Sequence, residues 1–222
     1  MTDEIDARIR RIRDVRDRLS REGPIRSRPI ERDFETVSLP RADCDVLRDA
    51  VRAEQAVVVI EVGLAYGSSA LAIGEALASN AAPECRHVIV DPFQMTAFGG
   101  AGWQAMCEAG LDRTTLLLFE PSSVALPRLL GEGLVADAAF VDGSHRFHEV
   151  FLDLYYLRKL VRPGGLVVLD DATFPSVATA LAYFDVNLRW ERVDLDSRLE
   201  ARRLPADREE PAFTAFQPFT ST

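Results

Sequence analysis

The chain has 222 residues and a hydrophobic fraction of 47%, which suits one α/β domain with a sizeable core. It carries 26 Lys plus Arg against 35 Asp plus Glu, and this acidic balance disfavours nucleic acid as a partner. The charged N-terminus is unlike a signal peptide, and no stretch reaches the roughly 20 apolar residues of a membrane span. We therefore expect a cytoplasmic protein that binds no membrane. Three scattered cysteines, Cys44, Cys85 and Cys107, predict neither a disulfide framework nor a thiolate zinc site.

Residues 3–21 predict an amphipathic helix, and a linker follows it. One face carries an apolar residue every three or four positions: Ile5, Ile9, Ile12, Val15 and Leu19. Two prolines and a glycine in GPIRSRP, residues 23–29, then break the pattern. We therefore divide the chain into an N-terminal helix with linker, 1–29, and a main domain, 30–222. The apolar stripe can pack on its own domain, but our hypothesis is that it meets a second subunit, in a homo-oligomer such as a dimer, or covers a site mouth.

From residue 43 onward, short apolar runs alternate with segments of helical period. The runs are AVVVIEVG, HVIVD, TLLLFE, DAAFVDG and GLVVLDD. They predict an α/β fold with a doubly wound, mostly parallel, Rossmann-like sheet, whose ligand edge is formed by the carboxyl ends of the strands. Near the C-terminus, NLRWERVDL and PAFTAFQPF, separated by an arginine-rich turn, predict an antiparallel hairpin at the edge of the sheet.

Acidic residues end four of the predicted strands. They are Glu61, Asp91, Asp142 and the pair Asp170 and Asp171. A carboxylate at the end of a doubly buried strand is costly unless a ligand, a metal or backbone donors meet it. Each acid alone can equally be a helix cap or turn residue, but four at one edge predict a site.

Glycines follow the first of these strands, in EVGLAYGSSA. The dinucleotide fingerprint would need glycine at position 65, where the chain has Ala65, so a nicotinamide cofactor is disfavoured. Gly63 and Gly67 permit close approach of a ligand, and Ser69 offers a hydroxyl and an N–H group to a carboxylate. Asp91, at the next strand end, can hold both hydroxyls of a ribose. Together these residues indicate an adenosine-type ligand.

From residue 36 to about residue 195, the chain resembles the class I S-adenosylmethionine-dependent methyltransferases. It is most similar to a bacterial group with the motifs DPFQ (Asp91–Gln94), GG-x-G (Gly99–Gly102) and DG-x-H (Asp142–His145), related to metal-dependent catechol-type and sugar O-methyltransferases. The resemblance implies the cofactor-binding residues Glu61, Gly63, Leu64, Ala65, Gly67, Ser69, Asp91, Ser122, Ser123 and Asp142. Ser122 and Ser123 follow Pro121 and can equally be helix-capping residues.

The same resemblance implies a magnesium ion, or another divalent cation, held by Asp142, Asp170 and Asp171. Hard oxygen ligands suit magnesium, and a hydroxyl bound to it loses its proton more readily. His145 matches the position of the general base, and a histidine can accept a proton near neutral pH. The alternative for His145 is a turn residue before the next helix. His148 lies inside that helix, where a structural role is favoured.

The function implied by the resemblance is that of a magnesium-dependent O-methyltransferase. Its acceptor would be a small hydroxylated metabolite, such as a sugar or a natural-product intermediate. Two alternatives stay open: a metal-independent enzyme of the same fold, and a non-catalytic module that binds the cofactor. The acceptor itself has no readable code, although Phe93, Phe98, Trp103 and Phe174 are candidates to line its pocket.

Overall fold

The structure is a computed structural model that describes residues 2–25, 34–82 and 84–207. Within this part of the chain, seven strands form one sheet in the order β3-β2-β1-β4-β5-β7-β6. Their bounds are β1 (Val58–Val62), β2 (Arg86–Val90), β3 (Thr115–Leu118), β4 (Ala136–Val141), β5 (Val161–Leu169), β6 (Glu191–Val193) and β7 (Glu200–Arg203). Strands β1 to β5 pair in parallel, and β7 is antiparallel to both β5 and β6. The predicted Rossmann-like sheet with an antiparallel edge is confirmed.

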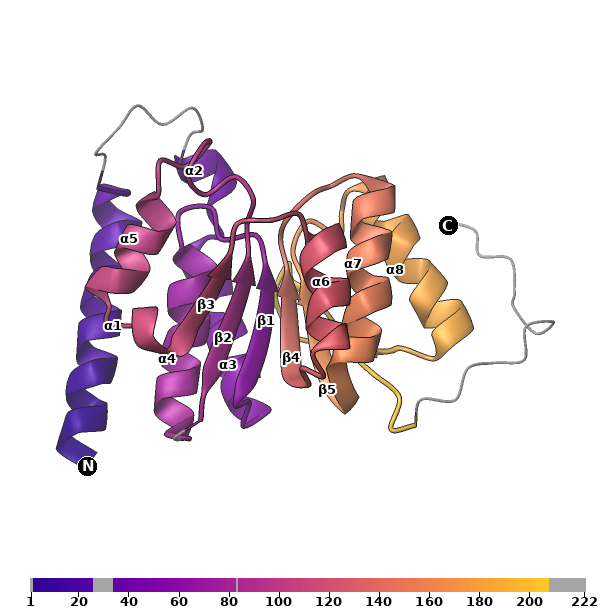
Figure 1. Ribbon diagram of the computed structural model, residues 1–222, viewed down its shortest axis with the longest axis horizontal. Coiled ribbons are helices and arrows are strands. Elements are labelled where there is room, and N and C mark those ends of the chain that lie inside the picture. Colours follow the sequence, from indigo (N-terminus) through magenta and orange to yellow (C-terminus); the bar gives the residue numbers. More distant parts are fainter. Residues whose placement is uncertain (1, 26–33, 83, 208–222) are drawn as a thin grey trace.

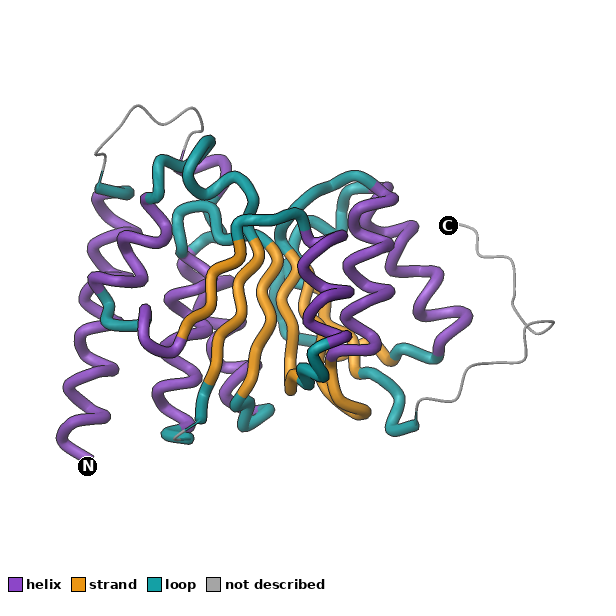
Figure 2. The backbone as a smooth tube through the Cα atoms, in the orientation of Figure 1, coloured by secondary structure: helices purple, strands orange, loops and turns teal. Residues whose placement is uncertain are grey.

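Helices cover both faces of this sheet (Figure 1). One face packs against α6 (Ser122–Gly131), α7 (Phe147–Leu160) and α8 (Pro175–Leu188). The other side carries α3 (Arg41–Ala53), α4 (Ser68–Asn80), α5 (Ala101–Glu108) and, outside α4 and α5, α1 (Thr2–Glu22). Two short elements complete the set, α2 (Phe34–Val37) and η1 (Asp112–Thr114). The loops at the carboxyl ends of the strands gather along one edge of the three-layered molecule (Figure 2).

The central strands are buried on both faces because their runs are apolar without interruption. In β1, Ile60 and Val62 belong to the core beneath α6 to α8, whereas Val59 belongs to the core beneath α3 and α4. Successive side chains of a strand point to opposite faces. This alternation places Glu61, which is fully buried, on the α4 side of the sheet.

The C-terminal hairpin exists, but its second strand is not the predicted one. β7 consists of residues that we expected to form an arginine-rich turn, and PAFTAFQPF lies outside the described residues. Arg202 of β7 donates to Asp185 at 2.8 and 3.0 Å, and Arg203 donates to both oxygens of Glu54 at 2.6 and 2.7 Å. Because these guanidinium groups keep ionic partners, charged residues are tolerated in this strand. The strand therefore lacks the apolar run by which the other strands were predicted.

The N-terminal helix packs on its own domain. The buried part of its stripe contacts α4 and α5 through Ile12, Val15 and Leu19. The buried guanidinium of Arg16 pairs with the fully buried Glu75 of α4 and, at 2.8 Å, with Asp45 of α3. The hypothesis that the stripe meets a second subunit is therefore wrong for these three residues, and the alternative that it covers a site mouth stays a prediction. Most of the predicted linker, residues 26–29, lies outside the described residues.

No helix in the described ranges is long and apolar enough to cross a membrane.

We predict that Arg16→Met lowers the free energy of unfolding by about 3 kcal/mol, at the low end for a broken buried ion pair. Glu75 would keep Arg13, whose side chain is 56% exposed, and Arg48, whose Nη1 is 3.9 Å away. Urea denaturation measures the loss. The control is Arg128→Met, which removes the exposed pairs with Glu120 and Glu132 and should leave the urea midpoint nearly unaltered. Equal losses in the two variants would contradict the prediction.

Candidate active site

The acidic strand ends lie side by side because the parallel ladder continues to its last residues. The N–H of Gly63 donates to the carbonyl of Val90 at 2.9 Å, and the N–H of Asp142 donates to that of Val62 at 2.9 Å. The N–H of Asp170 donates to the carbonyl of Val141 at 3.1 Å. The neighbouring strands β2, β1, β4 and β5 therefore end side by side, at the edge of the sheet where the sequence predicted a site.

Residues 63–67, the glycine loop, form the turn between β1 and α4. Gly63 has a φ of +98°, and a Cβ atom there would lie 2.2 Å from the carbonyl oxygen of Asp142. Gly102, at the start of α5, approaches the other side of the loop, since a Cβ atom there would lie 2.5 Å from the carbonyl oxygen of Ala65. The glycine loop is thus held between β4 and α5, and these two contacts require glycine.

The carboxylate of Asp91 holds the glycine loop in place through hydrogen bonds to its backbone. Its Oδ2 accepts hydrogen bonds from the N–H groups of Leu64 at 3.1 Å and Ala65 at 3.0 Å, and its Oδ1 accepts one from Phe93 at 2.8 Å. Both oxygens of this buried carboxylate are therefore engaged by backbone donors. The structure shows Asp91 as a residue that shapes the loop, and its contact with a ribose stays a prediction.

Gln94 joins the DPFQ and GG-x-G motifs. Its fully buried side chain donates from Nε2 to the carbonyl of Ala65 at 2.8 Å and accepts at Oε1 from the N–H of Gly102 at 3.0 Å. The amide thereby clamps the glycine loop to the start of α5. We did not assign Gln94 a role from the sequence, although it ends one of the two motifs that we singled out there.

A buried group of three side chains lies behind the glycine loop. The hydroxyl of Ser69, in the first turn of α4, donates to Oε1 of Glu61 at 2.5 Å. Nε2 of His87, in β2, lies 2.9 Å from Oε2 of Glu61. Glu61 and His87 are 0% and 1% exposed, so water does not reach this contact. His87 had no place among the predicted site residues.

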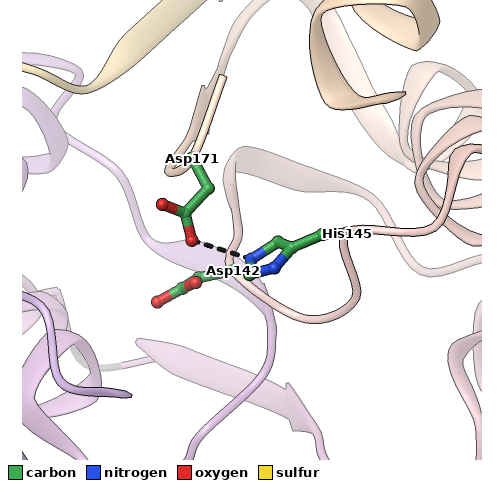
Figure 3. Close-up of side chains that lie close together, drawn as sticks. All are labelled: Asp142, His145 and Asp171. Atoms are coloured by element: carbon green, nitrogen blue, oxygen red, sulfur yellow. Dashed lines mark ion pairs between the residues drawn. The ribbon is translucent and has the colours of Figure 1, made fainter. Parts of the chain in front are cut away.

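Asp142, His145 and Asp171 converge at the ends of β4 and β5 (Figure 3). One ligand atom from each lies within 4.8 Å of the others. Nε2 of His145 is 2.7 Å from Oδ2 of Asp171. The imidazole stacks on the ring of Phe174, with centroids 4.6 Å apart and planes within 9°, and the Ser176 hydroxyl donates to the His145 carbonyl at 2.5 Å. The start of α8 thus orients His145.

Asp170 has different neighbours, although it adjoins Asp171. Its Oδ2 lies 2.5 Å from Nη2 of Arg198, which comes from the loop between β6 and β7, and its Oδ1 accepts from the N–H of Asp171 at 2.8 Å. Of the predicted metal ligands, the structure gathers Asp142 and Asp171 around His145. Asp170 as a ligand stays a prediction.

The chemistry of this edge fits a divalent cation. Burial raises the pKa of Asp142 well above its usual range, and the charges of Asp170 and Asp171 raise it further. Burial also raises the pKa of Asp170, while the Asp171 N–H and Arg198 oppose the shift. A bound cation would offset this repulsion between carboxylates. Two carboxylates beside an imidazole are ligands that divalent ions accept.

Ser122 and Ser123 are the first two residues of α6, after the N-cap Pro121, so they are not N-cap residues. The Ser122 side chain hydrogen-bonds to Asp153 of α7. Asp153 is 1% exposed, and burial raises its pKa to about 7. The contact of these two serines with the edge of an adenine ring stays a prediction.

The four aromatic candidates for the acceptor pocket separate into two groups. Phe98 is buried against Tyr66, at 5.2 Å between ring centroids, and Trp103 packs on the core beneath α1. Phe93 and Phe174 are 61% and 44% exposed, so these two have ring surface to offer a ligand, and one face of the Phe174 ring stacks on His145.

Gly63→Ala should remove several kcal/mol of stability, because the new methyl group would collide with the Asp142 backbone at a positive φ. The matched control is Gly131→Ala at the end of α6, where a Cβ meets nothing within 4 Å. Because alanine favours the helix, that change should be neutral or add up to about 1 kcal/mol. Thermal and urea denaturation compare the two, and a stable Gly63→Ala protein would refute the close approach.

Asp153 predicts a pH-dependent stability of definite sign. Between about pH 4 and pH 7 the unfolded chain releases this proton while the folded chain keeps it, so stability falls as the pH rises. Above the folded pKa the loss is complete, at about 4 kcal/mol. Asp153→Asn should remove this component, which urea denaturation across the window measures as the difference from the unaltered protein. Parallel pH curves for the two proteins would show that Asp153 titrates normally.

Residues 60–172, just over half of the chain, match the model of a family described as a methyltransferase domain. Among solved structures, cofactor-bound Rv0187 from MTB is 16% identical, with a TM-score of 0.64 and 91% of each chain covered. The O-methyltransferase TomG from Streptomyces achromogenes, involved in tomaymycin synthesis and solved with SAM, is 17% identical, with a TM-score of 0.63 and 89% of each chain covered. The O-methyltransferase from Bacillus cereus, in complex with SAH, is 12% identical, with a TM-score of 0.59, and covers 89% of this chain and 90% of its own. At these identities the structural likeness shows the fold, and no curated protein matches the sequence.

Proposed function

The chain belongs to the methyltransferase domain family, and we propose that it is a magnesium-dependent O-methyltransferase that uses S-adenosylmethionine (SAM). The acceptor would be a small hydroxylated metabolite, such as a sugar or a natural-product intermediate. The observation that carries the proposal is the convergence of Asp142, His145 and Asp171 beside the glycine loop. The O-methyltransferase structures solved with SAM and S-adenosylhomocysteine (SAH) share this fold and support the choice of cofactor. We also expect a cytoplasmic homo-oligomer, an expectation that rests on the sequence alone.

In this proposal the cofactor lies along the carboxyl ends of β1, β2 and β4. The glycine loop would receive its methionine end, and the close approaches of Gly63 to Asp142 and of Gly67 to Gly102 would fix the shape of the loop there. The ribose would meet the loop that Asp91 shapes, and the adenine would meet the start of α6 at Ser122 and Ser123. These contacts are proposals that follow from the position of each residue at the same edge of the sheet.

His145 is the proposed general base. Its Nε2 faces Asp171 at 2.7 Å, so the other ring nitrogen, Nδ1, would take the proton of the acceptor hydroxyl, and Asp171 would stabilise the imidazolium that forms. The acceptor oxygen then bonds to the methyl carbon as the carbon–sulfur bond breaks, and the sulfur keeps the electron pair. Phe174 and Ser176 restrain the histidine, which reduces the cost of reaching an aligned geometry.

The proposed magnesium site consists of Asp142, Asp170 and Asp171. When bound there, the ion would lower the pKa of the acceptor hydroxyl and orient it. Asp142 and Asp171 already share an edge with His145, whereas Asp170 would have to exchange Arg198 for the ion. A metal-independent methyltransferase is the second candidate, because the His145–Asp171 pair can accept a proton without a cation.

Turnover of labelled SAM over a panel of hydroxylated acceptors tests the proposal, with and without a chelator. His145→Gln should lower turnover by roughly 10²–10⁴-fold and leave SAH affinity nearly intact. Asp142→Asn should raise the magnesium concentration needed, because an amide is a poorer ligand for a hard cation. The control is His148→Gln, the same change at an exposed position of α7, which should leave turnover unaltered.

Three results would count against the proposal in different ways. Full turnover with chelator would favour the metal-independent enzyme. Unaltered turnover of His145→Gln would remove the general base. Binding of SAH with no methyl transfer to any acceptor would favour a cofactor-binding module.

A further inference from the structure

Arg198 brings a positive charge to the acidic edge of the site. It lies in the loop between β6 and β7, and its Nη2 is 2.5 Å from Oδ2 of Asp170. The side chain of Asp170 is only 4% exposed, so water screens this contact little. Burial and the charges of Asp170 and Asp171 raise the pKa of Asp142, and the charge of Arg198 opposes them. The guanidinium therefore acts on the whole group of acids.

A second acid, Asp43 in the first turn of α3, holds the same loop. Nε of Arg198 lies 3.3 Å from Oδ2 of Asp43, and the hydroxyl of Ser197 donates to Oδ1 of Asp43 at 2.8 Å. These two contacts with α3 do not involve Asp170. Arg198 can therefore leave Asp170 while the loop stays attached to the domain.

Both oxygens of Asp170 are engaged while Arg198 is in place. Oδ1 accepts the N–H of Asp171 at 2.8 Å, and Oδ2 faces the guanidinium. Each carboxylate oxygen keeps a further lone pair, but a cation that approached Oδ2 would meet the positive charge of Arg198. Because like charges repel strongly where water is scarce, the cation and the guanidinium cannot share this oxygen without a large cost.

We propose that Arg198 is a positioning residue for cation binding that competes with the divalent ion for Asp170. This inference rests on the proposed magnesium site. The guanidinium holds Asp170 at the edge of the site when no ion is bound, and it gives up this contact when the ion binds. The protein thereby carries its own counter-charge, and its affinity for the ion is lower than three crowded carboxylates would otherwise provide.

Titration with manganese(II) measures this competition without any turnover. Manganese accepts the same carboxylate ligands as magnesium, and its paramagnetic resonance signal reports the free ion. Arg198→Met should bind the ion about 10-fold more tightly than the unaltered protein, the lower end for a hydrogen bond between charged groups, because Arg198 is 47% exposed. Arg198→Lys keeps the charge but loses the planar fork, so it should bind the ion more weakly than Arg198→Met.

Two controls separate competition at Asp170 from a general loss of positive charge. Arg192→Met removes another arginine of the same hairpin, which is 69% exposed and pairs with Glu200, and it should leave the affinity for the ion unaltered. In an Asp170→Asn background, Arg198→Met should no longer tighten binding, because the oxygen for which the two cations compete has lost its charge. This double-mutant cycle isolates the pair of residues.

The thermal stability of the protein provides a second readout that a merely structural arginine would not change. Because linkage is reciprocal, an ion that displaces Arg198 must reduce the stability that Arg198 contributes. Arg198→Met should therefore lower the melting temperature in the presence of a chelator, and saturating manganese(II) should narrow the difference from the unaltered protein. An arginine that only braces the loop would give the same difference with and without the ion.

The outcomes distinguish this inference from the function on which it rests. Unchanged or weaker binding of the ion by Arg198→Met would overturn the competition and leave the magnesium site standing. Equal tightening in the Asp170→Asn background would show a general effect of charge, and would overturn the inference as well. If neither the unaltered protein nor Arg198→Met binds the ion, the magnesium site is also overturned, and the metal-independent methyltransferase remains. Binding by Arg198→Met alone would support the inference.

Discussion

The approach of Gly63 to the carbonyl oxygen of Asp142 is the constraint on which the rest of the site depends. It brings the glycine loop against the end of β4. The loop expected to bind the cofactor therefore lies next to the cluster of Asp142, His145 and Asp171. Asp91 and Gln94 then hold the loop from the other side, through backbone groups of Leu64, Ala65 and Gly102. Because these hydrogen bonds go to backbone groups of the loop and of α5, the shape of the loop does not depend on the side chains of the loop residues.

The handling of buried charge separates the structural parts of the molecule from the candidate site. Arg16 and Glu75 neutralise each other between α1 and α4, and Arg203 and Glu54 do so at the hairpin. At the ligand edge the acids are crowded instead, and the pKa of Asp142 rises because burial and neighbouring carboxylates both oppose its charge. Of these acids, Arg198 pairs with Asp170 alone, so three carboxylates crowd around one arginine, and such an excess of like charge is suited to a cation.

Several features of the site were predictable because they depend on local sequence. Unbroken apolar runs identified β1, β2, β4 and β5, and the acid after each run had to reach the common edge of a parallel sheet. The tight turn at Gly63 and the proximity of Asp142 to Asp171 follow from that topology. Charged strands carry no such signal, which is why β7 was expected to be a turn.

The sequence by itself determined the sheet, its ligand edge and the acids that end its strands, because apolar periodicity and parallel topology are local or general rules. Tertiary structure alone decided which side chains pair across elements. His87 meets Glu61 from the next strand, Arg198 meets Asp170 from a distant loop, and Ile12, Val15 and Leu19 of α1 pack against α4 and α5. These contacts join residues far apart in the chain, and their geometry depends on the packing of whole elements, which no local pattern encodes.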